Sequence, residues 1–599
     1  MFLRLTKKLY ICKTVVNIMK HLLLFRWLIA AAFLFVFLQI YYSFHFYYIE
    51  QNQLFLLSWN YVLNELLEPG GFSLIISEFL VQFFILPYAG AAVTSLLLIG
   101  AGMVFEQLLK HMFPGKNLFL LSLFLPLALL FAHFDFNYFT QGTVSFLLML
   151  AALLVCSRIA DSKVRLVVSC LMAPLLFVVA GPVSVLFAGC LFLIELLKLS
   201  SRSYLFICPL IVAVFLSLLS VYYSVEGDFR FAFLPDAYYH SELKPKEPVY
   251  LAWLVLPLIL LFVYLVRDRK LPGRKSRAFA VLIQLLLLTG SAYWGIKTYG
   301  ELKSSLLKEL DYYARTEQWN RIVGHCQGKV TNYLYMNYLN MSLAQKGLLG
   351  DQMFAFDQRD PRSLLVNANR TAAVSTLLSD VYFAMGDVAS AQQMAFEGYV
   401  AAPGYGNPRL LKRLVQTNLI FGAYPVAEKY ISLLEKTFFY SKWASEQRKF
   451  LWKDDLVAGD ALLGKMRKCL PGANHLMSQD GPLSDMEAIA VANPESKAAF
   501  HYMAGACLLS KDLQKFKQLM DTYYGTPVLP VLPVPYQEAV ITFAEQDTAY
   551  WHRFNISNDV VIRFSEYKRQ VLANRSYPNV SSVMAASYGK TYWYFYMFK

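Results

Sequence analysis

Long apolar runs fill the first half of the chain and are nearly absent from the second half. A helix needs about 20 apolar residues to cross the hydrocarbon core of a bilayer. By that rule the pattern predicts nine membrane spans, near 23–46, 88–109, 117–133, 139–157, 166–181, 183–198, 203–223, 249–266 and 278–297. The fifth and sixth are short and meet at Gly181-Pro182, so they form either two spans or a re-entrant pair. Both arrangements return the chain to the same side.

The second half has the pattern of an ordinary soluble helical protein, with weak internal similarity among residues 337–356, 377–396 and 416–434. Gly347, Gly386 and Gly422 recur in these segments at steps of 39 and 36 residues, near the 34 of a tetratricopeptide repeat. The expected fold class is therefore all-α: a polytopic transmembrane helix bundle followed by a soluble α-solenoid of degenerate tetratricopeptide-like helix pairs. We expect roughly five to seven pairs, each burying its apolar face against its neighbours.

Three regions follow from these patterns: a transmembrane domain over 1–299, helical repeats over 300–525, and a C-terminal region over 526–599. The proline-rich tract 523–537 is expected not to be helical, because proline removes a backbone donor and clashes with the preceding turn. It is either a linker or a strap over the end of the solenoid. The aromatic segment 586–599 either docks on a membrane face or packs back on the repeats.

Composition and charge support a membrane protein. The 599 residues are 57% hydrophobic and 16% charged, against about 45–50% and 25% in soluble domains. The net charge of +14 does not indicate nucleic acid, because Lys and Arg cluster in short loops between apolar runs, as in the loops that orient membrane helices.

The distribution of Lys and Arg predicts the orientation. With the N-terminus cytoplasmic, nineteen basic residues lie in inner segments, and only Arg230, Lys244 and Lys246 lie in outer loops. The chain is thus expected to be a multi-pass protein of the bacterial inner (cytoplasmic) membrane, with its C-terminal half in the periplasm. The first helix is followed by bulky Tyr and Phe rather than a cleavage site, so we expect it to remain as an anchor.

The eight cysteines include no CxxC pair, so neither a zinc site nor a disulfide scaffold is indicated. We predict no metal ligands, and the sequence identifies no cofactor.

The stretch 47–87 carries four acidic residues and no Lys or Arg, and its two amphipathic segments meet at Pro69-Gly70-Gly71. Glu50 stands at the exit of the first span. Other polar residues of the outer segments are Gln53, Asp135, Arg230, Asp236 and His240. Two interpretations stay open: outer loops keep acids simply because they lack positive charge, or these residues form one extracytoplasmic site, since ionisable groups at a membrane boundary are often functional.

One span, an acidic residue at its outer end, two interfacial helices and a proline before the next span resemble the GT-C glycosyltransferases. These enzymes transfer sugars from lipid-phosphate donors, and an acidic residue of their first outer loop acts as base or binds metal. The resemblance implies that Glu50 is the catalytic base. Gln51 stands where the family usually has a second acid, so the resemblance does not extend to metal binding.

The whole chain resembles a family of uncharacterised bacterial inner-membrane proteins with a helical-repeat C-terminal part. The motifs that carry this resemblance are EQNQLF at 50–55, PGG at 69–71, FLVQFF at 79–84 and SLAQKGLLGDQMF at 342–354. It supports the architecture and implies no activity.

Two functions are therefore expected. The first is a transferase that uses a lipid-linked sugar. Its expected catalytic residues are Glu50, Asp135 and Asp236, and its expected substrate-binding residues are Arg230, His240 and Gln53. The helical repeats would recruit an acceptor or a periplasmic protein. The alternative is a non-enzymatic scaffold for envelope assembly, since solenoids offer long binding surfaces. Transport or lipid flipping ranks below both, because the spans contain few ionisable residues near their centres. Membrane lipid is a partner in every case, and nucleic acid in none.

Overall fold

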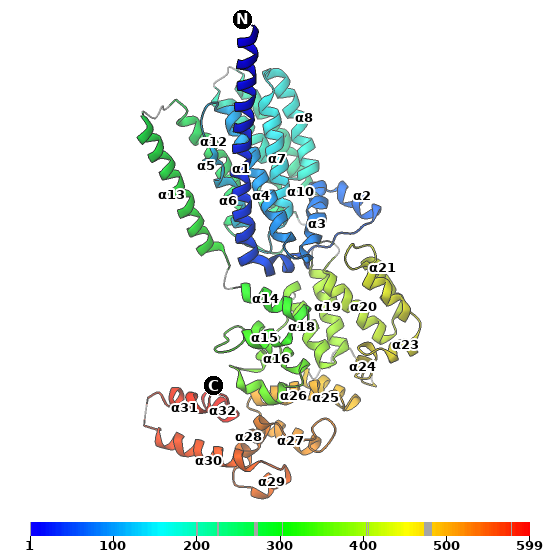
Figure 1. Ribbon diagram of the computed structural model, residues 1–599. Coiled ribbons are helices and arrows are strands. Elements are labelled where there is room, and N and C mark those ends of the chain that lie inside the picture. Colours follow the sequence, from blue (N-terminus) through cyan, green and yellow to red (C-terminus); the bar gives the residue numbers. More distant parts are fainter. Residues whose placement is uncertain are drawn as a thin grey trace. The chain divides into compact units, whose positions relative to one another are not determined.

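The computed structural model is all-helical, and its described residues form two compact units, Met1–Ser305 and Leu306–Lys599. The structure describes residues 2–599 except 199–201, 225–226, 269–272, 302–303, 370, 403, 405, 473–481 and 577. Side chains are described from residue 24 onward, with the same gaps and without residue 274. Figure 1 shows the helices of both units.

The first unit is a bundle of long apolar helices. Its elements are α1 (Phe2–Glu50), α2 (Trp59–Leu67), α3 (Gly71–Val81), η1 (Gln82–Ile85), α4 (Ala89–Met112), α5 (Phe119–Ser122), α6 (Phe124–Ala132), α7 (Thr140–Arg158), α8 (Ser162–Ala180), α9 (Val183–Leu197), η2 (Ser203–Phe206), α10 (Ile207–Tyr223), α11 (Arg230–Phe233), η3 (Pro235–Tyr238), α12 (Pro248–Leu265) and α13 (Gly273–Tyr299).

Seven segments of the described residues are long and apolar enough to cross a membrane: Leu24–Glu50, Ala89–Met112, Thr140–Arg158, Ser162–Ala180, Ser203–Tyr223, Pro248–Leu265 and Lys275–Tyr299. The other two spans predicted from the sequence correspond to shorter apolar helices. Residues 117–133 hold α5 and α6, which are separated at Leu123, and residues 183–198 hold α9, with 15 residues. The chain is thus a membrane-embedded helical protein.

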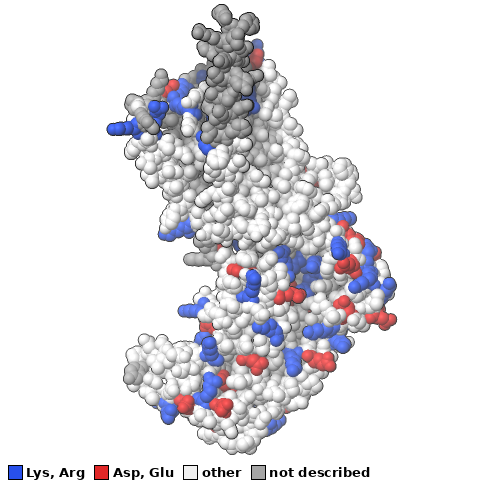
Figure 2. Space-filling view, in the orientation of Figure 1, with Lys and Arg blue, Asp and Glu red and all other residues white. Residues whose placement is uncertain are grey.

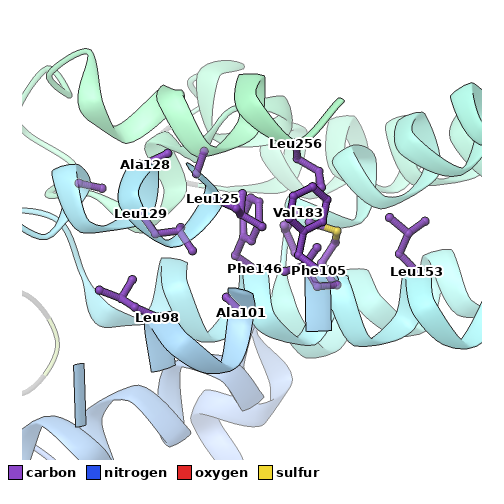
Figure 3. Packing of buried hydrophobic residues seen from close by; sticks show 14 of the residues in the cluster. Leu98, Ala101, Phe105, Leu125, Ala128, Leu129, Phe146, Leu153, Val183 and Leu256 are labelled. Carbon is purple, nitrogen blue, oxygen red and sulfur yellow. The ribbon is translucent and has the colours of Figure 1, made fainter. Parts of the chain in front are cut away.

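The bundle core is built from the facing sides of α4, α6, α7, α9 and α12. Leu98, Phe105, Leu125, Phe146 and Leu256 are buried together there (Figure 3). Small residues let α1 approach α4 closely: a Cβ on Gly90 would lie 2.4 Å from the Phe46 side chain, and one on Gly102 would lie 2.6 Å from Trp27. Such close approach through glycine is typical of helices that pack in lipid.

Side-chain contacts identify the two ends of the bundle. At the end that we name the Glu106 end, Arg165 of α8 pairs with Glu195 of α9 at 2.9 Å, and Lys116 donates a 2.8 Å hydrogen bond to the carbonyl of Val266 after α12. The opposite end, named the Glu50 end, holds the C-terminus of α1 and the segments 133–139 and 227–247. In Figure 2 the flanks of this unit are almost free of charged side chains, as expected for a lipid-facing surface.

The segment 51–87 folds as α2 and α3, joined at Glu68–Gly70. Gly70 has a φ of +83°, which glycine adopts readily. A Cβ on Gly71 would lie 1.7 Å from the carbonyl oxygen of Glu65. The predicted turn at 69–71 therefore depends on both glycines, and the Gly70 N–H ties it to the Val178 carbonyl of α8 at 2.9 Å.

The second unit consists of shorter helices. They are α14 (Ser305–Arg315), α15 (Trp319–His325), α16 (Tyr333–Gln345), α17 (Leu349–Gln352), η4 (Met353–Ala355), η5 (Pro361–Ser363), α18 (Ala372–Met385), α19 (Val388–Ala401), α20 (Pro408–Phe421), α21 (Tyr424–Leu434), α22 (Ser441–Gln447), η6 (Arg448–Phe450), α23 (Asp454–Gly459), α24 (Leu463–Arg467), α25 (Pro482–Ala492), α26 (Lys497–Leu509), α27 (Leu513–Tyr523), α28 (Val534–Phe543), α29 (Thr548–Arg553), α30 (Asn558–Ala573), α31 (Val580–Tyr588) and α32 (Tyr592–Phe598).

The segments with internal similarity fold as helix–turn–helix pairs. α16 and α17, α18 and α19, and α20 and α21 each pack against one another, and α19 also packs against α20. The turns fall at the recurring glycines, because Gly347, Gly386 and Gly422 all have positive φ angles. A left-handed residue after the last helical turn is a common helix ending, and glycine favours it.

The C-terminal region packs back on the second unit. The rings of Tyr592 and Phe595 in α32 lie 5.1 and 5.2 Å from Phe354 of η4. Residues 592–598 of the aromatic segment thus pack on earlier helices of the second unit. The expectation that 523–537 holds no helix is right for 524–533 and wrong at both ends, because α27 ends at Tyr523 and α28 begins at Val534. Pro535 sits in its first turn, where a missing N–H costs no helical hydrogen bond.

Candidate functional site

The exit of α1 carries a short block of buried polar side chains. Glu50, Gln51 and Gln53 are 3%, 4% and 6% exposed, although they follow a helix long enough to span a membrane. The Gln51 side-chain amide donates a hydrogen bond to the Glu50 carboxylate. The Gln53 side-chain oxygen has no hydrogen-bond donor among the described residues. Burying polar groups costs free energy unless they are paired or used, so this block is a candidate site.

Two loops at the Glu50 end pair with each other and bring distant residues together. Tyr138 and Tyr239 form an isolated antiparallel bridge. On its two sides, the Phe139 N–H donates to the Tyr238 carbonyl at 2.9 Å, and the His240 N–H donates to the Asn137 carbonyl at 3.1 Å. This pairing brings the segment that carries Asp135 beside the segment that carries Asp236.

The Asp135 carboxylate is only 3% exposed and is surrounded by donors. Oδ1 accepts hydrogen bonds of 3.0 Å from the backbone and side-chain amides of Asn137. Oδ2 accepts a 2.8 Å hydrogen bond from the Tyr239 hydroxyl and lies 3.1 Å from the Lys246 ammonium. Lys246 also pairs with Glu301, which follows α13. This carboxylate is therefore anchored in one orientation, and it connects three segments of the chain.

These contacts shift the titration of their partners. Burial, followed by the nearby Asp135 carboxylate, raises the pKa of Tyr239, so its hydroxyl remains a donor. Burial alone would lower the pKa of Lys246, but its pairing with Glu301 and Asp135 outweighs this, and the pKa of Lys246 is raised. Lys246 thus remains a cation between two carboxylates.

Asp236 is 1% exposed and less fully bonded. Its Oδ2 accepts a 2.8 Å hydrogen bond from the Tyr250 hydroxyl of α12. Its Oδ1 has no hydrogen bond among the described residues and lies 3.8 Å from an Arg230 Nη. Beside it, the Nδ1 of half-buried His240 also has no partner in the described part of the chain. Asp236 and His240 therefore keep unused hydrogen-bonding capacity.

Arg230 is an exposed member of the cluster, with 47% of its side chain accessible. Its guanidinium holds Asp228 through hydrogen bonds of 2.6 and 2.8 Å. These hydrogen bonds hold the pKa of Asp228 below its usual range. Arg230 thus joins a surface carboxylate to the buried Asp236 and stays accessible to an anionic group.

The two groups of predicted residues meet through aromatic rings. Tyr48, two residues before Glu50, makes an edge contact with Phe136 at 5.1 Å. Six residues before Tyr48, Tyr42 stacks on Phe134 at 4.8 Å. The structure therefore brings Asp135, Asp236, Arg230 and His240 into one loop cluster, and it positions Glu50 and Gln53 in a second group beside that cluster.

Sequence reasoning missed four members of the loop cluster: Tyr239, Lys246, Tyr250 and Glu301. Lys246 stood out as one of three outer basic residues, and that rarity was the available signal for its role. Tyr239 and Lys246 lie 104 and 111 residues beyond Asp135, so no local pattern could reveal their contacts with it.

No group of three or more His, Cys, Asp or Glu side chains capable of holding a metal ion occurs in the described part of the chain. The seven cysteines whose side chains are described are free. The Glu50 end offers carboxylates, amides, tyrosines and the cations Arg230, Lys244 and Lys246. Such a set can accept a proton, bind hydroxyl groups and neutralise a phosphate.

The fold and this site define a membrane-embedded helical protein with a polar cluster at one end of its bundle and a second helical unit. The chain belongs to DUF6057, a family of unknown function, whose model matches residues 18–599. No curated protein and no solved structure matches the chain. The resemblance to an uncharacterised family is thus supported over nearly the whole length, while the GT-C and tetratricopeptide resemblances gain no support from these comparisons.

Proposed function

We propose that this protein is an integral-membrane transferase that uses a lipid-linked sugar as donor. The observation that carries the proposal is the buried polar block Glu50–Gln53 at the exit of α1. Glu50 is the base in this proposal, because a general base must lie within hydrogen-bond reach of the acceptor hydroxyl. The Gln51 amide orients its carboxylate.

In the proposed reaction the acceptor hydroxyl attacks the anomeric carbon of the donor sugar. The bond from that carbon to the donor phosphate oxygen breaks, and the lipid phosphate leaves with the electron pair. Glu50 takes the hydroxyl proton, and Arg230 neutralises the phosphate, since guanidinium groups match phosphate geometry well. Asp236, His240 and Gln53 bind sugar hydroxyls, and Asp135 positions the loop.

We further propose nine membrane crossings. The segment 117–132 runs alongside α12. At one end of this segment Lys116 bonds to Val266, just after the α12 C-terminus. At its other end Asp135 contacts Tyr239 and Lys246, which precede the α12 N-terminus. Likewise, the Arg165–Glu195 pair joins the start of α8 to the end of α9. α9 therefore runs back along nearly the full length of α8. Both short segments therefore accompany helices that are long enough to span.

With nine crossings, the excess of Lys and Arg at the Glu106 end orients that end to the cytoplasm. The Glu50 end and the second unit then face the periplasm of a bacterial inner membrane. The helix pairs of the second unit form a tetratricopeptide-like solenoid in this proposal, and they recruit the acceptor.

The experiment is the substitution Glu50→Gln, which keeps the shape of the side chain and removes the base. Membranes containing the protein are supplied with a panel of polyprenyl-phosphate sugars, and transferred glycan is measured by mass spectrometry. We expect transfer to fall by about a hundredfold or more. The matched control is Glu68→Gln on the exposed α2–α3 turn, which should keep full transfer. Undiminished transfer by Glu50→Gln, at a normal protein level, contradicts the proposal.

A second candidate is a scaffold that presents the second unit to envelope-assembly partners. The observation that favours it is the Asp135–Lys246–Glu301 chain of ion pairs, which anchors the residues that leave α13. The Tyr42 hydroxyl reinforces this anchor by donating a 2.8 Å hydrogen bond to the Gly300 carbonyl. Photo-crosslinking from the second unit in intact cells tests it. A scaffold gives the same crosslinked partners in Glu50→Gln as in the unchanged protein.

A further inference from the structure

Helix α2 is packed against the first unit on one side. The Tyr61 side chain is 3% exposed, and its hydroxyl donates a hydrogen bond to the Glu78 carboxylate of α3. The Phe55 ring lies 5.6 Å from the Tyr61 ring and 5.5 Å from the Phe79 ring, so the segment before α2 packs over the same contact. The inner side of α2 is thus fixed to α3.

The opposite side of α2 is apolar and open. Trp59, Leu63, Leu66 and Leu67 are 71%, 42%, 37% and 83% exposed, and we name these four side chains the α2 face. Their spacing of three and four residues places them on one side of the helix. In Figure 1 α2 projects sideways from the bundle. Large apolar side chains gathered in this way mark an interaction surface.

The α2 face continues an exposed apolar stripe of α8. The members of this stripe, each more than half exposed and three or four residues apart, are Val164, Val167, Leu171, Leu175 and Val178. Helix α8 is long and apolar enough to cross a membrane, so its exposed stripe faces lipid. At the end of the stripe the Val178 carbonyl accepts the 2.9 Å hydrogen bond from Gly70, three residues after Leu67. The lipid-facing surface of a span therefore runs directly onto α2.

The composition of α2 fits the boundary of a bilayer. Tryptophan is enriched at membrane–water interfaces, and Trp59 opens the helix. Asn60 and Asn64 are exposed beside the apolar side chains. A helix of this kind lies in the interface plane with its apolar side among the acyl chains. Because residues 47–87 hold no Lys or Arg, the contact does not depend on anionic headgroups.

We infer that the α2 face inserts into the acyl-chain layer of the leaflet at the Glu50 end. Its occupant is lipid, because the face is continuous with the lipid-facing stripe of α8. The link between Glu50 and α2 is packed, since Leu54, Phe55 and Leu56 are buried. Insertion of α2 therefore also fixes the depth of the Glu50–Gln53 block at the membrane boundary. The inference concerns α2 alone and does not rest on the proposed transfer reaction.

The first experiment uses the full-length protein in phosphatidylcholine vesicles that contain a small share of a lipid with a diazirine on its acyl chain. After irradiation, mass spectrometry locates the lipid adducts. We expect adducts on the peptide that contains the α2 face, at a yield similar to that of the α8 stripe. The control is α30 of the second unit, whose exposed Ile562 and Leu572 should take none. Labelling of α2 that does not exceed that of α30 overturns the inference.

The second experiment measures water access at two neighbouring positions in the same vesicles. Leu67→Cys puts a thiol on the α2 face, and Glu68→Cys puts one on the exposed turn beside it as the matched control. A charged maleimide that cannot enter the bilayer should label Leu67→Cys at least about tenfold more slowly, because the reactive thiolate is disfavoured in an apolar layer. Equal labelling of the two variants overturns the inference. Slow labelling of Leu67→Cys without acyl-chain adducts on α2 also overturns it, since protein then covers the face, either a second copy or the second unit.

Discussion

The indole N–H of Trp27 donates a 2.8 Å hydrogen bond to the carboxylate of Glu106, and this bond joins α1 to α4. The same carboxylate lies 3.1 Å from Arg26 and 2.8 Å from Lys110, and it is almost fully buried. A buried carboxylate with three donors is stable only while its partners remain. Glu106 therefore acts as a structural connection at its end of the bundle.

We expect Glu106→Leu to lower the free energy of unfolding by about 2–3 kcal/mol, because it leaves the Trp27 N–H and two cations without an acceptor. Denaturant unfolding in detergent measures the change. Asp268→Asn, at an exposed carboxylate, is the control and should stay within about 0.5 kcal/mol of the unchanged protein. Equal losses in the two variants would show that the Glu106 contacts contribute nothing.

The sequence predicted the elements of this fold better than the contacts between them. The PGG turn could be predicted because glycine has a direct physical cause there: Gly70 has a positive φ, and Gly71 leaves no room for a Cβ. The apolar runs likewise predicted helices in the right places. The sequence predicts one span over 117–133, and the break at Leu123 has a physical cause in Pro126, which lies in the first turn of α6. Proline has no N–H to donate to the Ser122 carbonyl, so it disfavours a continuous helix through this point.

The sequence could place the candidate site residues on one side of the membrane but could not reveal the contacts between them. Charge counting selected Asp135, Asp236, Arg230 and His240 as residues of one side, and the structure brings them together through the Tyr138–Tyr239 bridge. The role of Lys246 was not found, because its ion pairs join residues far apart in the sequence. Nor could the pattern tell which carboxylates have hydrogen bonds on both oxygens. Asp135 has them on both, whereas one oxygen of Asp236 has none among the described residues.

Glu538 gives the second unit a pH-dependent stability. Its carboxylate accepts a 2.7 Å hydrogen bond from the Tyr592 N–H at the start of α32, and burial raises the pKa of Glu538 to about 7. The folded pKa lies above the ordinary value of 4.5, so the folded state binds more protons between these values. Stability therefore falls as pH rises from about 4.5 to about 7.

We expect the contribution of Glu538 to be about 1–3 kcal/mol less favourable at pH 8 than at pH 5. Glu538→Gln should remove this part of the pH dependence. Unfolding free energies measured for both proteins between pH 5 and pH 8 provide the comparison. A difference between the two proteins that stays constant over this range would contradict the prediction.

His501 acts in the opposite direction. Its ring nitrogen lies 3.0 Å from the Tyr536 hydroxyl, and burial, with a smaller effect of Lys497, lowers the pKa of His501 to about 4. The folded pKa lies below the ordinary value of 6.5, so the unfolded state binds more protons between the two. Stability therefore rises as pH increases from about 4 to about 6.5.

We expect the free energy of unfolding of His501→Gln to rise by about 1–3 kcal/mol less over this pH range than that of the unchanged protein. Unfolding measured at pH 4, 5, 6 and 7 gives the comparison. His552→Gln on the exposed side of α29 should follow the unchanged protein, and a parallel curve for His501→Gln would count against the prediction.

Two glycines that end helices allow backbone strain to be separated from crowding. Gly386 after α18 has a φ of +93°, and a Cβ there would lie 3.0 Å from the Cys469 sulfur. Gly347 after α16 has a φ of +69° and open space where a Cβ would stand. Gly347→Ala should therefore cost only the left-handed backbone penalty, about 1 kcal/mol. Gly386→Ala should cost about 2–3 kcal/mol, because Cys469 must also move within a packed interior.

Unfolding free energies of the two variants test this. In a Cys469→Ala background, Gly386→Ala should cost only the backbone penalty, because the sulfur that crowds the new Cβ is gone. Equal costs at the two glycines would mean that the contact with Cys469 relaxes freely, and that the backbone conformation alone decides both positions.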